Sequence, residues 1–442
     1  MKTAIKPTAG IVFLICASSA LAQTVAPPYE VATWNGFRTA AVSYTFDDNT
    51  SNQFALAVPM FNEFGYHMTF FTVTGSGPAP DWFHADWAGL AAAAAQGHEV
   101  ASHGVTHTSF SGMKDSLQIE ELRNSRDTIE ARVPGRRCVT IAYPYCTIGR
   151  KSLVQQYYIA GRNCSGTVES RTPPDFMSIS SIICGSQGLR TTKDFKSRTA
   201  AAVKSKGWVI LLIHGVDNDG GWSPLPSDTL RKTLEYLKAN DGQFWVASFG
   251  DAARYIRERN AASVVESSAD AERLIVQVTD TLDNTVFDVP VTLRRPLPEG
   301  WLSAAVSQNG IPIEAKITEV DSVKVVQFDA LPDGGDVVIA RSEGTGIAGR
   351  AGRAIRSPVL WQNYPNPFNP ETVIRFETTG AGPVALRICD ALGREVAVPV
   401  RGNLQPGLHS VVFSAAGLES GVYICTLREG GFVLHRKMLL LR

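Results

Sequence analysis

Between about residues 31 and 260, short apolar stretches alternate with stretches of helical periodicity. A strand that is followed by a helix and then by another strand usually belongs to a parallel sheet, so this alternation predicts an α/β domain. Such a sheet is either open and doubly wound or closed as a barrel, and both forms bind ligands at the carboxyl ends of their strands. We expect strands at 39–46, 68–73, 99–102, 139–142, 178–183, 208–213 and 244–248, and helices at 87–95, 117–131, 229–239 and 252–259.

The helical periodicity ends near residue 260, and the remaining chain has a pattern of short strands and turns. Residues 265–340 predict a small all-β domain. A stretch rich in Gly, Ser and Arg at 341–357 is typical of a flexible linker. Residues 358–442 open with closely spaced prolines, which forbid a helix, and predict a second β domain. The expected chain is therefore an α/β domain at 31–260 followed by two small all-β, sandwich-like domains.

The first residues predict export. Lys2 and Lys6 precede an apolar run at 11–17, and Ala20-Leu21-Ala22 has the A-x-A pattern of a signal-peptide cleavage site. The apolar run is shorter than the roughly 20 residues that span a bilayer, which disfavours the alternative of a membrane anchor. We expect a signal peptide at 1–22, a mature chain without a transmembrane segment, and a secreted or cell-surface location.

The charges of the chain disfavour nucleic acid as a partner. Acidic and basic residues balance at 42 each, and Lys and Arg form no run. A protein that binds nucleic acid needs a basic surface to neutralise phosphates. We therefore expect no nucleic-acid partner.

Six of the seven cysteines lie beyond the expected signal peptide, in a chain that is expected to enter an oxidising compartment. Their spacings lack the close pairs of a zinc ribbon, so one or two disulfides are expected within each of two groups. The spacing does not decide the connectivity. The groups are Cys138, Cys146, Cys164 and Cys184, and then Cys389 and Cys425.

Polar side chains follow four of the expected strands directly. Asp47 and Asp48 come at the end of one strand, His103 and His214 follow two others, and a fourth runs into residues 143–145. The carboxyl ends of barrel strands meet at one rim, so we expect these groups to lie together there, which favours the barrel over the open sheet.

His103 and His107 are four residues apart, so both imidazoles can bind one ion if the chain turns helically after the strand. Alone, such a pair is weak evidence, and paired aspartates often cap a helix or occupy a solvated turn. The carboxylate of either Asp47 or Asp48 would be the third ligand. Catalytic zinc sites have three protein ligands and keep a fourth position open for water. The other would point elsewhere and act as a base toward that water.

The region from about residue 40 to residue 249 resembles carbohydrate esterase family 4, the polysaccharide deacetylases related to rhizobial nodulation proteins. Four motifs of the family occur in its order. They are Thr45-Phe46-Asp47-Asp48, Ser102-His103-Gly104-Val105-Thr106-His107, Tyr143-Pro144-Tyr145 and Leu211-Leu212-Ile213-His214.

The resemblance implies a distorted (β/α) barrel in which Asp48, His103 and His107 bind a divalent metal. Zinc is the favoured ion, and cobalt, nickel and manganese are alternatives. The resemblance also implies that this metal-dependent hydrolase removes N-acetyl groups, or O-acetyl groups, from an acetylated polysaccharide or oligosaccharide outside the cell.

The resemblance further assigns roles to residues around the metal. Asp47 is the expected general base, His214 is the expected general acid, and the backbone N–H of Tyr145 is expected to help hold the oxyanion.

The sequence departs from the family pattern at the third motif. That motif usually begins with an Arg that pairs with the base, but Ile141-Ala142 occupies its place, and Cys146 replaces the usual Gly. Arg162 is the candidate to supply the missing charge. The Asp-Trp pair that the family often has before its last motif is also absent, and Asp175 is a weak substitute.

Residues 358–442 resemble the C-terminal sorting domain of proteins exported by the type IX secretion system. The resemblance rests on an N-Y-P-N-P-F-N-P opening at 363–370, an Asp-Ala-Leu-Gly-Arg turn at 390–394 and a Gly-Val-Tyr strand at 421–423. It implies the outer-membrane secretion machinery as a partner. A stalk or adhesion β-sandwich is the alternative.

Two other functions remain open. A non-haem iron oxygenase also binds its metal through two histidines and a carboxylate, but its carboxylate commonly lies close to the first His in sequence, unlike Asp48 and His103. The altered third motif and the β domains also fit a catalytically impaired, surface-displayed glycan-binding protein. The retained Asp47 and His214 argue against that alternative.

Overall fold

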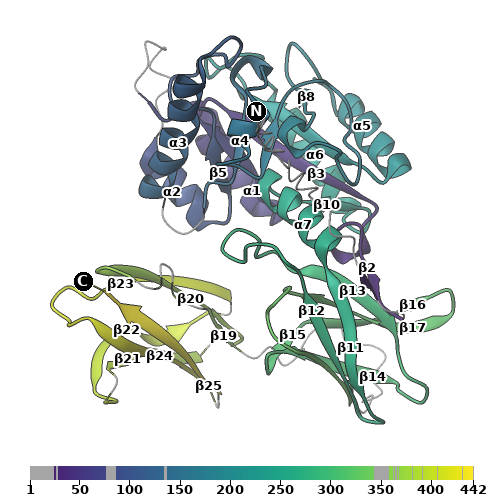
Figure 1. Cartoon of the computed structure of the whole chain (residues 1–442), viewed down its shortest axis with the longest axis vertical. Helices are drawn as coiled ribbons and strands as arrows, with labels where there is room; N and C mark the ends of the chain where they lie inside the picture. Colours follow the sequence, from purple (N-terminus) through teal and green to yellow (C-terminus); the bar gives the residue numbers. More distant parts are fainter. Residues whose placement is uncertain are drawn as a thin grey trace, which may run out of the picture.

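The computed structural model describes residues 24–25, 28–75, 86–133, 137–342 and most of 358–441 (Figure 1). In the last range it leaves out residues 362, 364, 365, 367, 381, 391, 406 and 431. The expected signal peptide at 1–22 and residues 343–357 of the expected linker lie outside the described residues.

The first part of the chain forms a curled parallel sheet of eight strands. Seven lie in the order β7-β6-β5-β4-β3-β9-β8, and β10 pairs with β3. An isolated parallel bridge from Arg162 to Ile179, just before β8, brings the two edges of the sheet together. The strands are β3 (Ala40–Asp47), β4 (Thr69–Thr72), β5 (Glu99–Ser102), β6 (Thr140–Ala142), β7 (Ala160–Arg162), β8 (Ile182–Ile183), β9 (Trp208–Ile213) and β10 (Phe244–Val246).

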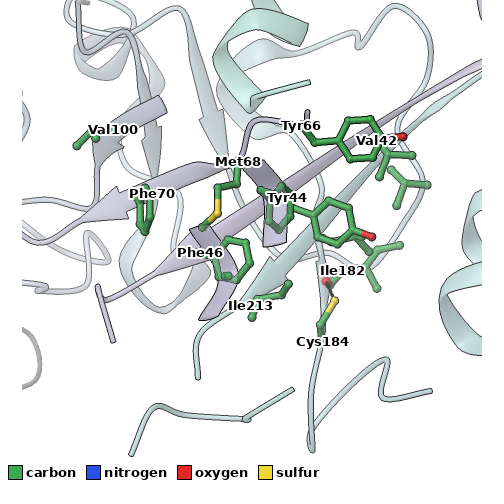
Figure 2. Packing of buried hydrophobic residues seen from close by; sticks show 14 of the residues in the cluster. Val42, Tyr44, Phe46, Tyr66, Met68, Phe70, Val100, Ile182, Cys184 and Ile213 are labelled. Atoms are coloured by element: carbon green, nitrogen blue, oxygen red, sulfur yellow. Dashed lines mark hydrogen bonds between the residues drawn. The ribbon is translucent and has the colours of Figure 1, made fainter. Parts of the chain in front are cut away.

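Helices cover the outer face of this sheet (Figure 1). In β3, Val42, Tyr44 and Phe46 alternate with smaller inward residues, as the period of a strand requires, and they join the outer hydrophobic core (Figure 2). The helices that contribute to this core are α1 (Val58–Phe64), α2 (Trp87–Ala95), α3 (Asp115–Arg132), α4 (Lys151–Val154), α5 (Thr192–Ser205) and α6 (Ser227–Ala239).

The inner face of the sheet carries small side chains because a helix packs against it. Ala101, Ala142 and Ala160 lie in one buried cluster with Phe249 and other residues of α7 (Phe249–Ala261). These alanines also leave room at the rim for larger polar groups on the same face. The expected distorted (β/α) barrel is therefore confirmed, with its interior filled by α7.

Two further sheets follow the barrel and form the expected all-β region. Their orders are β1-β11-β12-β18-β14-β15 and β16-β17-β13-β2. The sheets also include β1 (Thr24–Val25) and β2 (Glu30–Val31), which precede the barrel in sequence. The remaining strands are β11 (Ser263–Ala269), β12 (Arg273–Thr279), β13 (Val291–Pro296), β14 (Ser303–Gln308), β15 (Ile311–Ile313), β16 (Ala315–Val320), β17 (Val323–Ala330) and β18 (Val337–Ser342).

The C-terminal region forms two small antiparallel sheets around its own core. One has the order β19-β20-β23, and the other has the order β22-β21-β24-β25. Within the described ranges, no helix has the length and apolar content needed to cross a bilayer. The strands are β19 (Val359–Leu360), β20 (Glu371–Thr378), β21 (Gly382–Asp390), β22 (Glu395–Leu404), β23 (Gly407–Ser414), β24 (Gly421–Glu429) and β25 (Phe432–Leu440).

One disulfide, between Cys146 and Cys164, forms in the first group of cysteines. The expected bridge in the second group is wrong, since Cys389 and Cys425 are free thiols. Cys425 lies opposite Ile388 in the β21–β24 ladder, and neighbouring residues of a strand point to opposite faces of the sheet. Cys389 therefore faces away from Cys425.

Candidate active site

The rim begins with an unusual turn at the end of β3. Asp47 is the last residue of this strand, and Asp48 and Asn49 follow it with φ angles of 71° and 55°. Such left-handed angles are uncommon outside glycine, although Asp and Asn adopt them more readily than other residues, and residues held in them cluster at functional sites. The Thr72 hydroxyl, which donates to Asn49 Oδ1 at 3.1 Å, helps to hold the turn. The two carboxylates are consequently directed differently.

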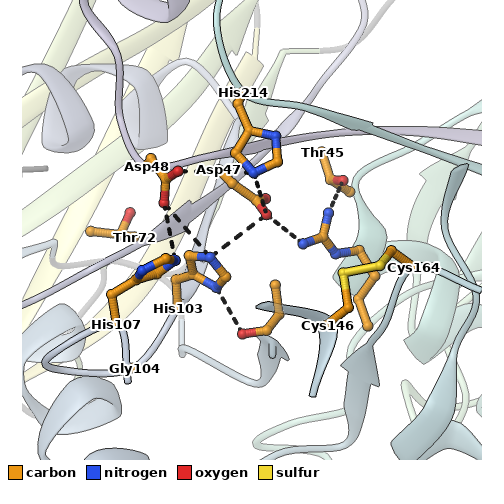
Figure 3. A network of polar contacts seen from close by, with 12 residues as sticks. Thr45, Asp47, Asp48, Thr72, His103, Gly104, His107, Cys146, Cys164 and His214 are labelled. Atoms are coloured by element: carbon orange, nitrogen blue, oxygen red, sulfur yellow. Dashed lines mark hydrogen bonds and ion pairs between the residues drawn. A yellow bond between two sulfur atoms is a disulfide. The ribbon is translucent and has the colours of Figure 1, made fainter. Parts of the chain in front are cut away.

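Asp48, His103 and His107 form a cluster of metal-ligand type, with one ligand atom from each within 4.8 Å of the others (Figure 3). Asp48 Oδ1 lies 3.7 Å from Nε2 of each histidine. His103 Nδ1 donates to the Ala142 carbonyl at 2.8 Å, which leaves Nε2 as the nitrogen that can bind an ion. The donor set is the two imidazoles and one carboxylate of many zinc hydrolases.

The electrostatics of the cluster also fit a cation. Asp48 Oδ1 is buried and accepts no hydrogen bond from any described residue. Burial, and then the charge of Asp47, raise the pKa of Asp48 well above its usual value. Burial lowers the pKa of His103 and of His107 to about 4, so both rings are neutral and ready to bind metal at pH 7. A bound cation would offset the cost of ionising the Asp48 carboxylate.

The segment that carries His107 is a loop, so the two imidazoles come together without the helical turn that was the condition for their meeting. Glu121 of α3 holds this loop through its carboxylate. It accepts hydrogen bonds from the backbone N–H of Val105 at 2.6 Å and of Thr106 at 3.1 Å, and another from the Thr106 hydroxyl at 2.6 Å. Nothing in the local sequence pattern identifies Glu121, because the contact joins a loop to a helix.

Arg162 of β7 forms a buried ion pair with Asp47. Its Nη2 donates to Asp47 Oδ2 at 2.6 Å, and its Nη1 donates to the Thr45 hydroxyl at 3.0 Å. Burial raises the pKa of Asp47, but the charge of Arg162, with smaller effects of His103 and His214, outweighs burial and leaves that pKa below its usual value. Asp47 is therefore an ionised carboxylate in a buried place.

Arg162 lies opposite Ala142 in the β6–β7 ladder. Ala142 belongs to the segment where the family usually has its arginine. Both residues point to the interior, so the guanidinium comes from the neighbouring strand and reaches Asp47 from there.

His214 follows β9, and its Nε2 lies 3.9 Å from Oδ2 of Asp47 and from Oδ2 of Asp48. Gln53 fixes the backbone here, since its Nε2 donates to the Asp47 carbonyl at 2.6 Å and to the His214 carbonyl at 2.9 Å. Trp222 meets the imidazole edge to face at 4.8 Å. Burial lowers the pKa of His214 to about 4.

These residues surround one pocket of about 390 Å³. Two exposed aromatic residues lie on it, Tyr145 with φ 54° and Trp222. A second pocket of about 360 Å³ lies beside α7 and the loop before β13, and no metal-ligand cluster among the described residues lines it. The lining of the first pocket consists of Asp47, Asp48, His103, His107, Tyr143, Tyr145, Cys146, Arg162, Ile183, Leu212, His214 and Trp222.

The structure brings all seven sequence-predicted site residues to this pocket. Asp175, the suggested substitute for the missing Asp-Trp pair, lies outside it. Its carboxylate caps the short turn Phe176–Ser178 by accepting from the Met177 N–H, and it pairs with Lys151. Sequence reasoning missed Glu121, Gln53 and Trp222, of which only Trp222, an aromatic shortly after the last motif, had a visible signal.

Comparison with solved structures gives matches of low identity, each over about half of this chain. A family 4 carbohydrate esterase from Bacillus anthracis is 15% identical, with a TM-score of 0.33, over 49% of this chain and 83% of that one. The Xyl-CE4 domain of a multidomain xylanase from the hindgut metagenome of Trinervitermes trinervoides is 19% identical, with a TM-score of 0.33, over 48% of this chain and 89% of that one. An allantoinase is 14% identical, with a TM-score of 0.40, over 51% of this chain and 92% of that one.

Comparisons of the sequence match this chain to one curated relative and to two families. A gellan lyase of a Bacillus species is 28% identical over 334 residues, which are 70% of this chain but span only 13% of that protein. Residues 35–158 match the polysaccharide deacetylase family, and residues 362–440 match the secretion system C-terminal sorting domain, which indicates export to the cell surface or the medium. The chain thus contains a polysaccharide deacetylase domain and a C-terminal secretion sorting domain.

Proposed function

We propose that this chain is a metal-dependent deacetylase that hydrolyses N-acetyl or O-acetyl groups of an extracellular glycan. The observation that carries the proposal is the buried Arg162–Asp47 pair at 2.6 Å beside the cluster of Asp48, His103 and His107. Hydrolysis of an amide or ester at a metal site needs an ionised base next to the position of the attacking water. The family match supports the same reaction class.

Asp48, His103 and His107 would hold the ion, with zinc favoured and cobalt, nickel or manganese as alternatives. When bound, a divalent ion supplies a Lewis acid that polarises the acetyl carbonyl and acidifies water. The remaining steps belong to side chains and backbone groups of the pocket.

Asp47 is the proposed general base. Arg162 holds only Oδ2, whereas Oδ1 is buried and accepts no hydrogen bond from the described residues. Oδ1 is thus the oxygen that can accept a proton from the attacking water. The lowered pKa of Asp47 keeps the carboxylate ready for this step at neutral pH.

His214 is the proposed general acid, and the backbone N–H of Tyr145 is the proposed oxyanion donor. With a pKa near 4, His214 is neutral at pH 7 before substrate binds, so it must gain the proton that it delivers to the departing nitrogen or oxygen. Asp47 receives a proton when water attacks, and its carboxylate approaches His214 Nε2 to 3.9 Å through Oδ2, so Asp47 is the proposed source of that proton.

The test is acetate release from acetylated chitooligosaccharides and acetylated xylan, with and without a chelator. An acetylated form of gellan belongs in the panel because of the relative named gellan lyase. Asp47→Asn is expected to abolish release, while Asp175→Asn, a change outside the pocket, is expected to retain it. Release that survives the chelator, or that is equal in Asp47→Asn, contradicts the proposal.

Export completes the proposal. The segment 1–22 would be removed as a signal peptide, and the C-terminal sorting domain would engage the outer-membrane secretion machinery. The match of residues 362–440 supports the second step. N-terminal sequencing of the exported protein, with Gln23 as the expected first residue, tests the first.

The alternative of a catalytically impaired glycan-binding protein rests on the altered third motif, which lacks its arginine, and on the two β domains. Arg162 provides a guanidinium at hydrogen-bonding distance from Asp47, which weakens that argument. Glycan binding by the whole chain without any acetate release would favour the alternative.

A further inference from the structure

The disulfide lies directly beside the proposed site (Figure 3). Cys146 follows Tyr145 in the turn after β6, and Cys164 comes two residues after Arg162 at the end of β7. The two strands are parallel neighbours, so both chain segments leave the sheet at the same rim. The bond therefore joins the third-motif turn to the segment that carries the partner of Asp47.

The third-motif turn has a strained backbone. Tyr145 and Cys146 have φ angles of 54° and 59°, in the left-handed region that glycine adopts most easily. The family pattern has glycine where this chain has Cys146. Two backbone hydrogen bonds hold the turn, from Cys146 N–H to the Tyr143 carbonyl at 2.9 Å and from Thr147 N–H to the Pro144 carbonyl at 3.1 Å. The disulfide adds a covalent link to this rigid turn.

Arg162, in contrast, lies in a three-residue strand that pairs with β6 on one side and meets Ile179 through an isolated bridge on the other. Its guanidinium must reach Asp47 and Thr45 from the inner face. A small shift of such a short strand would move the two hydrogen bonds out of line, and hydrogen bonds weaken steeply as their angle departs from linear. The site thus places the partner of its proposed base on a short strand, just before a cysteine that is covalently linked to the third-motif turn.

We propose that the Cys146–Cys164 disulfide is a positioning device for Arg162, which it anchors to the third-motif turn so that the guanidinium stays aligned with Asp47. This inference rests on the proposed function. It assigns the disulfide an indirect role, because the cysteines act through Arg162.

The test compares the full chain with Cys146→Ser/Cys164→Ser. Both cysteines are replaced together, since a single thiol beside the cluster could bind the metal. Mass spectrometry of unreduced peptides first verifies the bond in the parent protein, and free thiols at both positions would overturn the proposal. Cys389→Ser, which removes a free thiol from the C-terminal region, is the matched control.

We expect kcat for acetate release to fall by about 10-fold to 100-fold in the double variant, as for other small misalignments of a catalytic group. KM should change by less than about threefold in the same variant, and the control should equal the parent. Metal content should stay at the parent value, because Asp48, His103 and His107 lie on other segments. An unchanged kcat, or a loss of metal together with activity, contradicts the positioning role.

Two further variants separate positioning from general support of the fold. Cys146→Gly/Cys164→Ser removes the bond and relieves the backbone strain, and full activity in this variant would overturn the proposal. In an Arg162→Lys background, loss of the disulfide should lower kcat much less than in the parent, because the aligned guanidinium is already gone. Equal losses in both backgrounds would show that the bond acts independently of Arg162.

Failure of the positioning role can be distinguished from failure of the proposed function. If the parent protein releases no acetate from any substrate, the proposed function fails. If the parent is active and the disulfide variants are equally active, the deacetylase assignment stands and the positioning role falls.

Discussion

Arg162 donates a hydrogen bond of 2.6 Å to Asp47, although the two residues are 115 positions apart in the chain. The pair connects β7, at one end of the strand order of the barrel sheet, with β3 in the middle of that order. Ala142, in the segment where the family pattern places an arginine, lies opposite Arg162 in the β6–β7 ladder. A positive charge therefore lies beside the proposed base although the third motif itself lacks one.

Replacing Arg162 should change the pH dependence of the reaction. In Arg162→Met, burial of Asp47 remains while the compensating charge is lost, so the pKa of Asp47 should rise. A base must be ionised, and the acidic limb of the kcat/KM profile should therefore move to higher pH, with a lower maximum. Arg162→Lys should show a smaller shift, and the exposed Arg150→Met is the control. An acidic limb at the same pH in Arg162→Met contradicts the assignment of Asp47.

Removing metal ligands should remove both metal and activity. His103→Ala and His107→Ala each take one of three ligands from the cluster, so bound metal measured by elemental analysis should fall well below that of the parent. His409→Ala, in the C-terminal region, should retain both. Dialysis against a chelator and then zinc should abolish and restore activity in the parent. Full metal content in both ligand variants would mean that the ion binds elsewhere.

Glu121 should affect metal affinity without touching the metal. Its carboxylate holds the loop of Val105 and Thr106 between the two histidines. Glu121→Gln keeps the size of the side chain but weakens these hydrogen bonds, and changes of this kind typically cost 10-fold to 100-fold in metal affinity. Glu120→Gln, the exposed neighbour on α3, is the control. Equal affinities in competition with a chelating dye would exclude this role for Glu121.

Much of the barrel and its rim can be predicted from the sequence, because buried strands leave apolar runs and each run stops at the residue that reaches the rim. Asp47, His103 and His214 all come directly after such runs, so their convergence follows from the geometry of a parallel barrel. The strands after residue 260 can also be predicted, because helical periodicity ends there and short strand patterns begin.

Other features have no local signature. β7 is a three-residue strand, Ala-Gly-Arg, and nothing in its composition indicates a strand. Its existence depends on pairing with β6 and on the bridge from Arg162 to Ile179. The loop before His107 likewise takes its shape from Glu121, which is a tertiary contact. β1 and β2 pair with strands of the later β region, and the whole barrel lies between these partners in the sequence. No local pattern can predict such a pairing.

Glu258 lies at the contact between α7 and the β region that follows. Its Oε1 accepts the Val289 N–H at 3.0 Å, while its Oε2 is buried and accepts no hydrogen bond from the described residues. Burial raises the pKa of Glu258 from 4.5 to about 8. The folded state therefore holds a proton that the unfolded state releases, and this contribution to stability is present below pH 4.5 and is lost as the pH rises through 8.

Glu258→Gln imitates the protonated side chain at every pH. Its Tm should exceed that of the parent by about 10 °C or more at pH 8.5, since each pKa unit is worth about 1.4 kcal/mol and each kcal/mol shifts the Tm of a domain of this size by about 2–4 °C. The difference should shrink toward zero near pH 4.5. Glu314→Gln, an exposed change in the same β region, should follow the parent throughout. A difference in Tm that is independent of pH would mean that Glu258 is ionised in the folded protein.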